Sequence, residues 1–458
     1  MERFYCPPVP ELPTPGLGRA NGAVGRVLAW GGRGSAVGLV AVAWIAMTLV
    51  PTRGIEHAAA QRVAWLAVEG FGLGGSAILS EVWATVSEAF YDPDLNGVDA
   101  EGVVAEFTQA ADDARTPAEL REVVNASLAR LKASHTRLFT PDETAFYEVL
   151  DVFIPGGLQQ GQIAGQPRGA VSYVGIGCVT RGIDGRDFVT DVYPTGPADQ
   201  AGLRVGDEIV SVAGREWGPV EPFQGRAGEG TPLVVRRAQG MRALELTVTP
   251  ERIRPRAMYL KALQASAEEV ERDGCRLAYV HVRSYAHQSY QDALIELMDG
   301  RFAHADGLVL DLRGGWGGAS PDYTDAFNPA HPYMQVRGGS WGDVSRVWDR
   351  PLVVLIDEGT RSGKEMMADA LQRSGVATLV GTPTAGAVLG GTTFPMSDGS
   401  LLMVAVSDVR IDGGSLEANP VQPDVLVERP IPYCNGADPQ MEAGFHALIE
   451  RIGSRRPL

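Results

Sequence analysis

The sequence predicts a multidomain α+β protein whose C-terminal part is an α/β domain. Three observations support this: helical periodicity from about residue 60 to 150, short β-rich runs between residues 173 and 249, and alternating apolar strands and helices after Pro255. With 458 residues, of which 45 % are hydrophobic, the chain is long enough for several cores. The expected division is an N-terminal tail at 1–35, an apolar segment at 36–51, a helical domain at 60–152, a β module at 168–252 and the α/β domain at 255–458.

Charge and cysteine content exclude several classes of protein. The 56 acidic residues outnumber the 40 basic ones, and the net charge of −16 leaves no surface prepared for phosphates, so we expect no nucleic-acid partner. The four cysteines form no CxxC pair and lie near no histidine at zinc-ligand spacing, so no structural zinc site is expected. One disulfide, for instance between Cys275 and Cys434, stays open if the protein lies outside the cytosol.

The N-terminal segment predicts export. Residues 1–35 are rich in Pro and Gly and carry Arg19, Arg26 and Arg33, and residues 36–50 then run without a charge. This run is shorter than the roughly 20 residues that span a bilayer comfortably, so a cleaved signal and a short membrane anchor both stay open. Arginines before the run favour an extracytoplasmic location for the rest of the chain. The alternative is a buried apolar helix.

The helical region follows from periodicity and capping. Apolar residues spaced i, i+3, i+4, i+7 from Leu79 to Phe90 predict one helix, and the capping box Thr116–Glu119 with proline at the first helical position starts another at Pro117. The apolar face of the second helix ends just before Ser134-His135-Thr136. Residues 155–169 contain little that could pack and predict a linker.

The β module resembles a PDZ domain. The resemblance is carried by four segments in the family's order: 173–177 (YVGIG), 192–198 (VYPTGPA), 201–203 (AGL) and 206–209 (GDEI). It implies that backbone N–H groups of Gly175, Ile176 and Gly177 bind the C-terminal carboxylate of a peptide, which adds as a strand to a sheet edge. A β module without a ligand is the alternative.

A serine at a strand-to-helix turn is the first candidate for catalysis. Leu352 to Ile356 is a short buried strand, and a helix through Ala370 follows the intervening turn, which contains Ser362. A helix start offers unpaired N–H groups to an oxyanion, but serine is also a common N-cap residue. A second glycine-rich turn, 311–318 (DLRGGWGG), follows another buried strand, where backbone can approach a substrate closely.

These turns are similar to those of the tail-specific, or C-terminal processing, serine peptidases. Glu365, the segments 379–386 (LVGTPTAG) and 423–424 (PD), the segment 135–141 (HTRLFTP) and the PDZ-like module occur in that family's order. The resemblance covers nearly the whole chain after residue 75. It implies a ClpP/crotonase-like α/β peptidase core with a helical N-terminal domain and an inserted PDZ domain.

The usual catalytic lysine of the family is absent. Its position here is Ala387, and Lys364, two residues after Ser362, would not face the serine on a helix. The tricorn-core and nisin-resistance branches resemble this chain in using histidine, which implies His135 as the base, with an ordinary pKa of about 6.5. The alternatives are a structural role for His135, and His281 or His287 as the base.

The resemblance also implies the rest of the site. Glu417 lies where tricorn-like members carry an active-site glutamate and would orient the histidine; a surface carboxylate is the alternative. The oxyanion donors would be the N–H groups of Gly363 and of Gly317 or Gly318. Trp316 departs from the family's small or polar residue at this turn.

The sequence thus predicts an exported serine endopeptidase that needs no metal or organic cofactor. Its partners would be protein or peptide substrates recruited by their C-termini, with membrane contact only through an uncleaved N-terminal segment. Two non-catalytic rivals remain: a lipophile-binding protein like the interphotoreceptor retinoid-binding proteins, which resemble the same core, and a PDZ scaffold. The sequence leaves the oligomeric state and the physiological substrate open.

Overall fold

The computed structural model describes residues 74–153, 171–327 and 348–455. The predicted tail, the apolar segment at 36–51 and the linker at 155–169 lie outside these residues. Within the described ranges, no helix has the length and apolar character needed to cross a membrane. The domain boundaries expected from the sequence stay a prediction.

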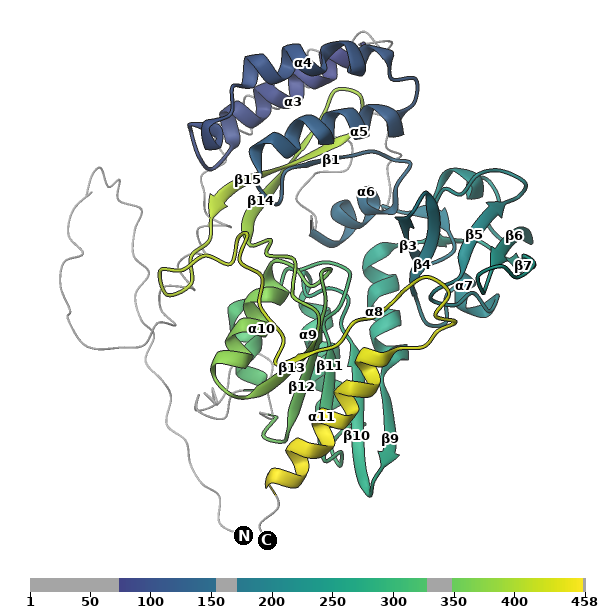
Figure 1. The fold of residues 1–458 in the computed structure, drawn as a ribbon, viewed down its shortest axis with the longest axis vertical. Coiled ribbons are helices and arrows are strands. Elements are labelled where there is room, and N and C mark those ends of the chain that lie inside the picture. Colours follow the sequence, from purple (N-terminus) through teal and green to yellow (C-terminus); the bar gives the residue numbers. More distant parts are fainter. Residues whose placement is uncertain (1–73, 154–170, 328–347, 456–458) are drawn as a thin grey trace, which may run out of the picture.

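The α/β core contains a six-stranded sheet in the order β16-β13-β12-β11-β10-β9, parallel except for β9 (Figure 1). The strands are β9 (Glu268–Arg272), β10 (Cys275–His281), β11 (Gly307–Asp311), β12 (Leu352–Ile356), β13 (Ala377–Gly381) and β16 (Val425–Leu426). Helix α11 (Pro439–Arg455) packs on one face, and α8 (Pro255–Ser266), α9 (Gln288–Asp299) and α10 (Gly363–Arg373) pack on the other. Because both faces are covered, β11 and β12 are buried throughout, and their sequences are continuous apolar runs.

The helical region packs on a separate three-stranded sheet. Helices α3 (Gly75–Ala89), α4 (Ala100–Asp113) and α5 (Pro117–Leu128) bury their apolar faces against β14 (Leu389–Pro395) and β15 (Leu401–Asp408). The third strand, β1 (Arg137–Phe139), pairs with β15 in the region that the sequence predicted as helical. Leu138 and Phe139 are buried on opposite faces of this strand, and such a short apolar run has no period that separates strand from helix. After β1 come helix α6 (Thr144–Glu148) and a π-helical turn, Val149–Phe153.

The predicted β module is present and packs beside the core (Figure 1). Its five-stranded sheet is ordered β3-β4-β5-β6-β7, and β2 (Tyr173–Gly175) pairs with β8 (Glu251–Ile253). The five strands are β3 (Cys178–Ile183), β4 (Arg186–Val192), β5 (Glu208–Val212), β6 (Thr231–Arg236) and β7 (Leu244–Val248), and the short helix α7 (Pro197–Gln200) follows β4. A bidentate ion pair between Arg283 of the core and Asp191 of β4, at 2.6 and 2.9 Å, ties the module to the core.

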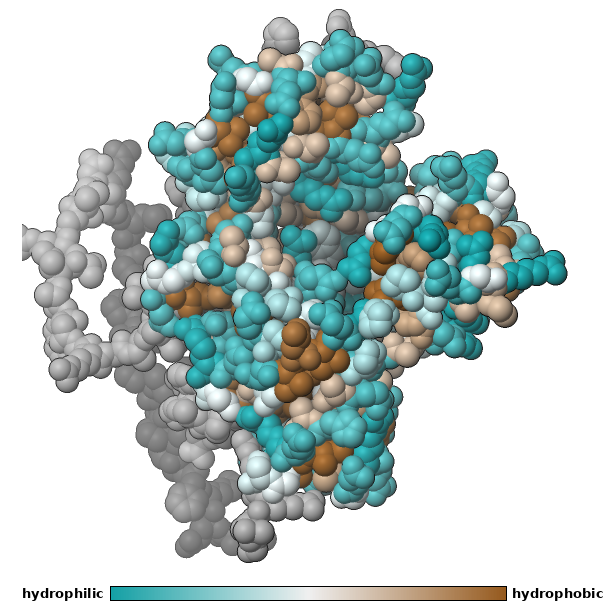
Figure 2. All heavy atoms as spheres, viewed as in Figure 1, coloured by the Kyte–Doolittle hydropathy of each residue, from teal (hydrophilic) through white to brown (hydrophobic). Residues whose placement is uncertain are grey.

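The cysteines of the described residues form no disulfide. Cys275 and Cys434 are both free, so the disulfide that the sequence left open does not form; Cys275 is buried in the core, and Cys434 Sγ donates to Val205 O. Figure 2 shows a face that is largely hydrophilic, with hydrophobic residues in small separate groups.

Candidate active site

Ser362 occupies a strained turn between a buried strand and a helix. Strand β12 ends at Ile356 and α10 begins at Gly363, so Ser362 is the residue that caps the helix. Its φ of 56° and ψ of −129° lie outside the regions that L-residues favour. The Ser362 N–H donates to Ala387 O at 3.0 Å and to Glu365 Oε2 at 3.1 Å. Strain of this kind is found at functional sites, and the two hydrogen bonds keep the turn in place.

The Glu365 carboxylate connects this turn to residues 384–387. It accepts hydrogen bonds from Thr384 Oγ1 at 2.6 Å, Gly386 N at 2.7 Å and Ala387 N at 2.8 Å, and its side chain is fully buried. A buried carboxylate with this many donors holds the backbone around it rigidly. Ala387, at the position of the family's lysine, therefore lies directly beside the backbone of the nucleophile candidate.

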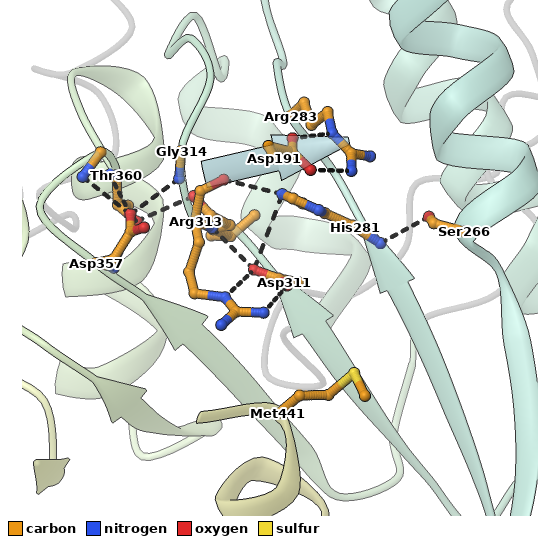
Figure 3. Close-up of polar contacts among 12 residues, drawn as sticks. Asp191, Ser266, His281, Arg283, Asp311, Arg313, Gly314, Asp357, Thr360 and Met441 are labelled. Atoms are coloured by element: carbon orange, nitrogen blue, oxygen red, sulfur yellow. Dashed lines mark hydrogen bonds and ion pairs between the residues drawn. The ribbon is translucent and has the colours of Figure 1, made fainter. Parts of the chain in front are cut away.

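A second buried carboxylate connects the two glycine-containing turns. Asp357 Oδ1 accepts from the N–H groups of Gly314 and Gly359 at 2.9 Å and of Thr360 at 3.0 Å (Figure 3). The next strand end is fixed in the same way, because Arg313 forms ion pairs with Asp311 at 2.6 Å and with Asp438 at 2.8 Å. The two loops that flank Ser362 are therefore fixed by polar networks at the carboxyl ends of β11 and β12.

The glycine turn contacts the nucleophile candidate directly. A Cβ atom on Gly317 would lie 2.6 Å from Ser362 Cβ and 3.1 Å from Gly363 N, and one on Gly363 would lie 2.4 Å from Ala319 N. Only glycine permits this approach. No hydrogen bond joins the N–H groups of Gly317, Gly318 or Gly363 to an acceptor in the described ranges. Free donors are therefore concentrated beside Ser362, where the sequence predicted them.

Residues 387 and 388 connect the surroundings of His135 to those of Ser362. Glu417 Oε2 accepts from Val388 N at 2.8 Å, and Ala387, the preceding residue, accepts from Ser362 N. The same carboxylate holds Ser134, which precedes His135 in the chain. The two predicted residues, His135 and Glu417, are therefore brought to the same side of the site as Ser362.

Ser134 lies between the carboxylate of Glu417 and the imidazole of His135. Its Oγ donates to Glu417 Oε2 at 2.8 Å and lies 2.8 Å from Nδ1 of His135, and its N–H donates to Glu417 Oε1 at 2.8 Å. A hydroxyl has one hydrogen, which the carboxylate takes, so Ser134 Oγ must accept from Nδ1–H of His135. This assignment leaves the lone pair on Nε2 of the imidazole.

Burial changes the proton affinity of this histidine. Desolvation, with a smaller contribution from the positive charge of Arg361, lowers the pKa of His135 to about 3. The ordinary value near 6.5 expected from the sequence therefore does not hold here. The imidazole is neutral throughout the physiological pH range.

The other basic candidates have structural roles. Lys364 Nζ donates to the carbonyls of Gly314 and Arg283, and burial lowers its pKa to about 7. His281 Nε2 hydrogen-bonds Arg313 O at 2.9 Å (Figure 3), and His287 Nδ1 accepts from Ser289 N at the start of α9. None of these side chains contacts Ser362.

Trp316 is held beside the glycine turn by a buried acid. Its Nε1 donates to Glu148 Oε2 at 2.7 Å, and its ring packs near Phe139 and Phe153, with ring centroids 6.2 and 5.7 Å apart. Burial raises the pKa of the Glu148 carboxyl. Trp316 therefore packs against the core and is also hydrogen-bonded to the helical region that precedes the β module.

The PDZ-like loop is placed next to a cationic pocket. Ile176 O and Gly177 O accept from Ala198 N at 2.8 Å and Tyr193 N at 3.0 Å, and Gly177 has a φ of +73°. Gly177 lines a pocket of about 270 Å³ between the module and α8. The basic residues of this pocket are Arg252, Arg254 and Lys261.

Comparisons with known proteins find relatives for three parts of the chain. Residues 276–427 match Peptidase family S41, residues 188–237 match the PDZ domain and residues 76–129 match the Tricorn protease C1 domain. The carboxy-terminal processing protease CtpB of Bacillus subtilis (strain 168) is 24 % identical over 277 residues, which are 57 % of this chain and 56 % of that protein. The carboxyl-terminal-processing protease of Synechocystis sp. (strain ATCC 27184 / PCC 6803 / Kazusa) is 24 % identical over 387 residues, 81 % of this chain and 86 % of the relative. A solved photosystem II D1 C-terminal processing protease superposes with a TM-score of 0.45 at 23 % identity, covering 81 % of this chain and 99 % of its own.

The family models thus identify a peptidase-like α/β core and a PDZ domain in one chain. Residues 276–427 are similar to peptidase family S41, in agreement with the resemblance to serine peptidases that the sequence predicted. The chain spans little more than half the length of the Bacillus relative.

Sequence reasoning missed two residues of this site. Ser134 was quoted only as the neighbour of His135, and its signal was its position directly before a candidate base. Glu148 carried no motif, because the burial that raises its pKa depends on the packing of Trp316 and α8 around it.

Proposed function

We propose that this protein hydrolyses peptide bonds through an acyl-enzyme on Ser362. The observation that carries the proposal is the strained turn of Ser362 with free N–H groups of two glycine turns beside it. His135 supports it, because Glu417 connects this histidine, through Ser134, to residue 388, next to the residue that accepts from Ser362 N. Ser362 Oγ attacks the substrate carbonyl while His135 accepts the serine proton. His135 then gives that proton to the leaving amine, and a water molecule hydrolyses the ester by the same route in reverse.

The remaining groups stabilise charge in this scheme. The N–H of Gly363 and that of Gly317 or Gly318 would bind the oxyanion, because they are beside Ser362 and have no other acceptor in the described ranges. Glu417 would stabilise the imidazolium through Ser134, which holds the histidine in one tautomer. The hydrogen bonds from Ser134 to Glu417 and between Ser134 and His135 are present before substrate binds.

The PDZ domain would bind the free C-terminus of a protein substrate. The pocket beside Gly177 supports this, since its lining contains three basic residues, Arg252, Arg254 and Lys261, and one acidic residue, Glu251, which leaves positive charge for a carboxylate. We further propose that the enzyme acts outside the cytoplasm, after export by residues 36–51, either secreted or anchored.

Family relatives that bind lipophiles or peptides without catalysis define the alternative. A fluorophosphonate probe separates the two, because only a reactive Ser362 is labelled covalently. The full chain should be labelled and should cleave an unfolded protein, whereas Ser362→Ala should do neither. Absence of both activities in a folded wild type would refute the proposal. For the PDZ role, Ser362→Ala protein should bind a peptide with a free C-terminus more tightly than its amide, and equal binding would remove that role.

A further inference from the structure

Arg361 lies next to Ser362 in the chain, and its positive charge has no acidic partner among the described residues. It directly precedes Ser362, its side chain is partly buried, and its guanidinium carbon lies 5.7 Å from the centroid of the Trp316 ring. The side chain therefore extends from the Ser362 turn toward Trp316 of the glycine-rich turn. Neither the catalytic scheme above nor the packing of the core uses it.

No hydrogen bond or ion pair within the described part of the chain engages this guanidinium. Most other arginines near the core have acceptors: Arg283 pairs with Asp191, Arg313 with Asp311, and Arg137, the nearest charged neighbour of Arg361 on β1, pairs with Glu143 at 2.6 Å. A guanidinium has five N–H donors, and removing them from water without an acceptor costs free energy. Desolvation accordingly lowers the pKa of Arg361.

The two carboxylates whose charge reaches Arg361 are already occupied. Glu365 accepts from Ser362 N, Thr384 Oγ1, Gly386 N and Ala387 N, and Glu417 accepts from the N–H and Oγ of Ser134 and from Val388 N. Neither forms an ion pair with Arg361. Their attachment to the backbone keeps them from turning toward the guanidinium, so its donors stay available to a molecule that enters the site.

Trp316 positions the guanidinium of Arg361 but accepts none of its hydrogen bonds. A guanidinium over an aromatic ring is held by cation–π attraction, but the ring accepts none of the N–H groups in the plane of the fork. Because Glu148 fixes the indole from the far side, the ring gives the guanidinium a stable support. The arrangement is a preorganised, bidentate donor beside the reacting serine.

We propose that Arg361 binds a carboxylate of the peptide substrate next to the scissile bond, so that this site selects acidic sequences or chain ends. The inference rests on the proposed role of Ser362 as the nucleophile. A carboxylate matches the fork of arginine in both geometry and charge, and the partly dehydrated site strengthens the pair. The group has two sources, an Asp or Glu side chain beside the cleaved bond and the α-carboxylate of a chain that ends there.

Three matched peptide pairs distinguish these sources. Cleavage sites in an unfolded protein are first mapped by mass spectrometry. The first pair of capped peptides then carries Glu or Gln on the acyl side of the cleaved bond, and the second carries Glu or Gln on the leaving side. The third pair ends just beyond the bond, as a free acid or as an amide. We expect kcat/KM at pH 8 to favour the carboxylate by about 10-fold or more in one pair. Arg361→Gln should abolish that ratio, and Arg137→Gln, which removes an arginine already paired with Glu143, should preserve it.

Several outcomes would overturn the inference while leaving the peptidase proposal intact. If the kcat/KM ratio of carboxylate to neutral peptide is near one in all three pairs, or is unchanged in Arg361→Gln, the guanidinium does not bind a substrate carboxylate. An equal loss of kcat for neutral and acidic peptides, with an acid limb moved to higher pH, would show that Arg361 acts only on His135.

A binding measurement keeps the test independent of catalysis. Ser362→Ala protein should bind the carboxylate member of the preferred pair about 10-fold more tightly by calorimetry, and Ser362→Ala/Arg361→Gln should not discriminate. Failure of wild type to cleave any peptide would refute the peptidase proposal, and the same Glu/Gln and acid/amide pairs, built on one fixed peptide sequence, would still decide by binding whether Arg361 binds a carboxylate. Equal affinities of the two peptides for Ser362→Ala would refute it.

Discussion

Glu417 accepts two hydrogen bonds from Ser134, a residue 283 positions earlier in the chain: one from the backbone N–H and one from the hydroxyl, both at 2.8 Å. Because the hydroxyl proton is used on Glu417, the oxygen of Ser134 can only accept from His135. One carboxylate thereby determines which nitrogen of the imidazole carries the proton.

Removal of Ser362 Oγ should abolish cleavage without unfolding the protein. Ser362→Ala deletes the nucleophile, but the turn is held by backbone bonds to Ala387 and Glu365 that alanine retains. We expect peptide hydrolysis to disappear and the melting temperature to stay within a few degrees of wild type. Loss of activity that follows only from a lowered melting temperature would contradict the assignment.

The Ser134–Glu417 pair should act through His135. His135→Gln should lower kcat by about 10²-fold or more, as expected for loss of a general base. Ser134→Ala leaves Nδ1 without its acceptor and should lower kcat by at least about 10-fold, since an unoriented imidazole loses its tautomer. Ser289→Ala is the matched control, because its hydroxyl lies 2.9 Å from Nδ1 of His287, outside the site. Equal activity of Ser134→Ala and Ser289→Ala would refute the relay.

The pH profile should extend far into the acid range. A base must be unprotonated, so activity is lost as pH falls through the pKa of His135, which burial places at about 3 rather than near 6.5. We expect kcat/KM to be almost unchanged between pH 8 and pH 5, measured on a neutral peptide. An acid limb centred near pH 6.5 would show that the imidazole is more hydrated than the structure indicates.

The Glu148 carboxyl should make stability depend on pH. Burial raises its pKa in the folded state, so the folded protein binds more protons than the unfolded chain just above the ordinary glutamate pKa, and stability falls as pH rises there. Glu148→Gln keeps an acceptor for Trp316 Nε1 and removes the buried charge. Its melting temperature relative to wild type should therefore increase from pH 4 to pH 8, whereas Glu106→Gln, in an exposed pair with Arg130, should give a flat difference. A flat difference for Glu148→Gln would contradict the pKa shift.

Placing a lysine at position 387, where the family resemblance implies one, should not increase kcat. Ala387 is buried, and its N–H and C=O are tied to Glu365 and Ser362. Ala387→Lys places a long cation in a site already organised around a neutral histidine, so kcat should stay the same or fall. A large increase in turnover would identify the wild type as a damaged Ser–Lys enzyme.

The sequence by itself determined the order of elements and the two turns of the site. The apolar runs that became β11 and β12, the capping box before α5 and the glycines around Trp316 act over a few residues, and local patterns record such short-range preferences. Ser362 and Gly363 could be located for the same reason, and the family resemblance added His135 and Glu417.

Only the tertiary structure decided how these residues act together. The contact of Ser134 with Glu417 joins segments far apart in the chain, and no periodicity reports such a pairing. Strand β1 was missed because it pairs with β15, which lies near the other end of the chain, and no local pattern reports that pairing. The pKa of His135 and the unmatched charge of Arg361 depend on how much water the packed domains exclude, and desolvation is a property of the assembled site rather than of any local sequence.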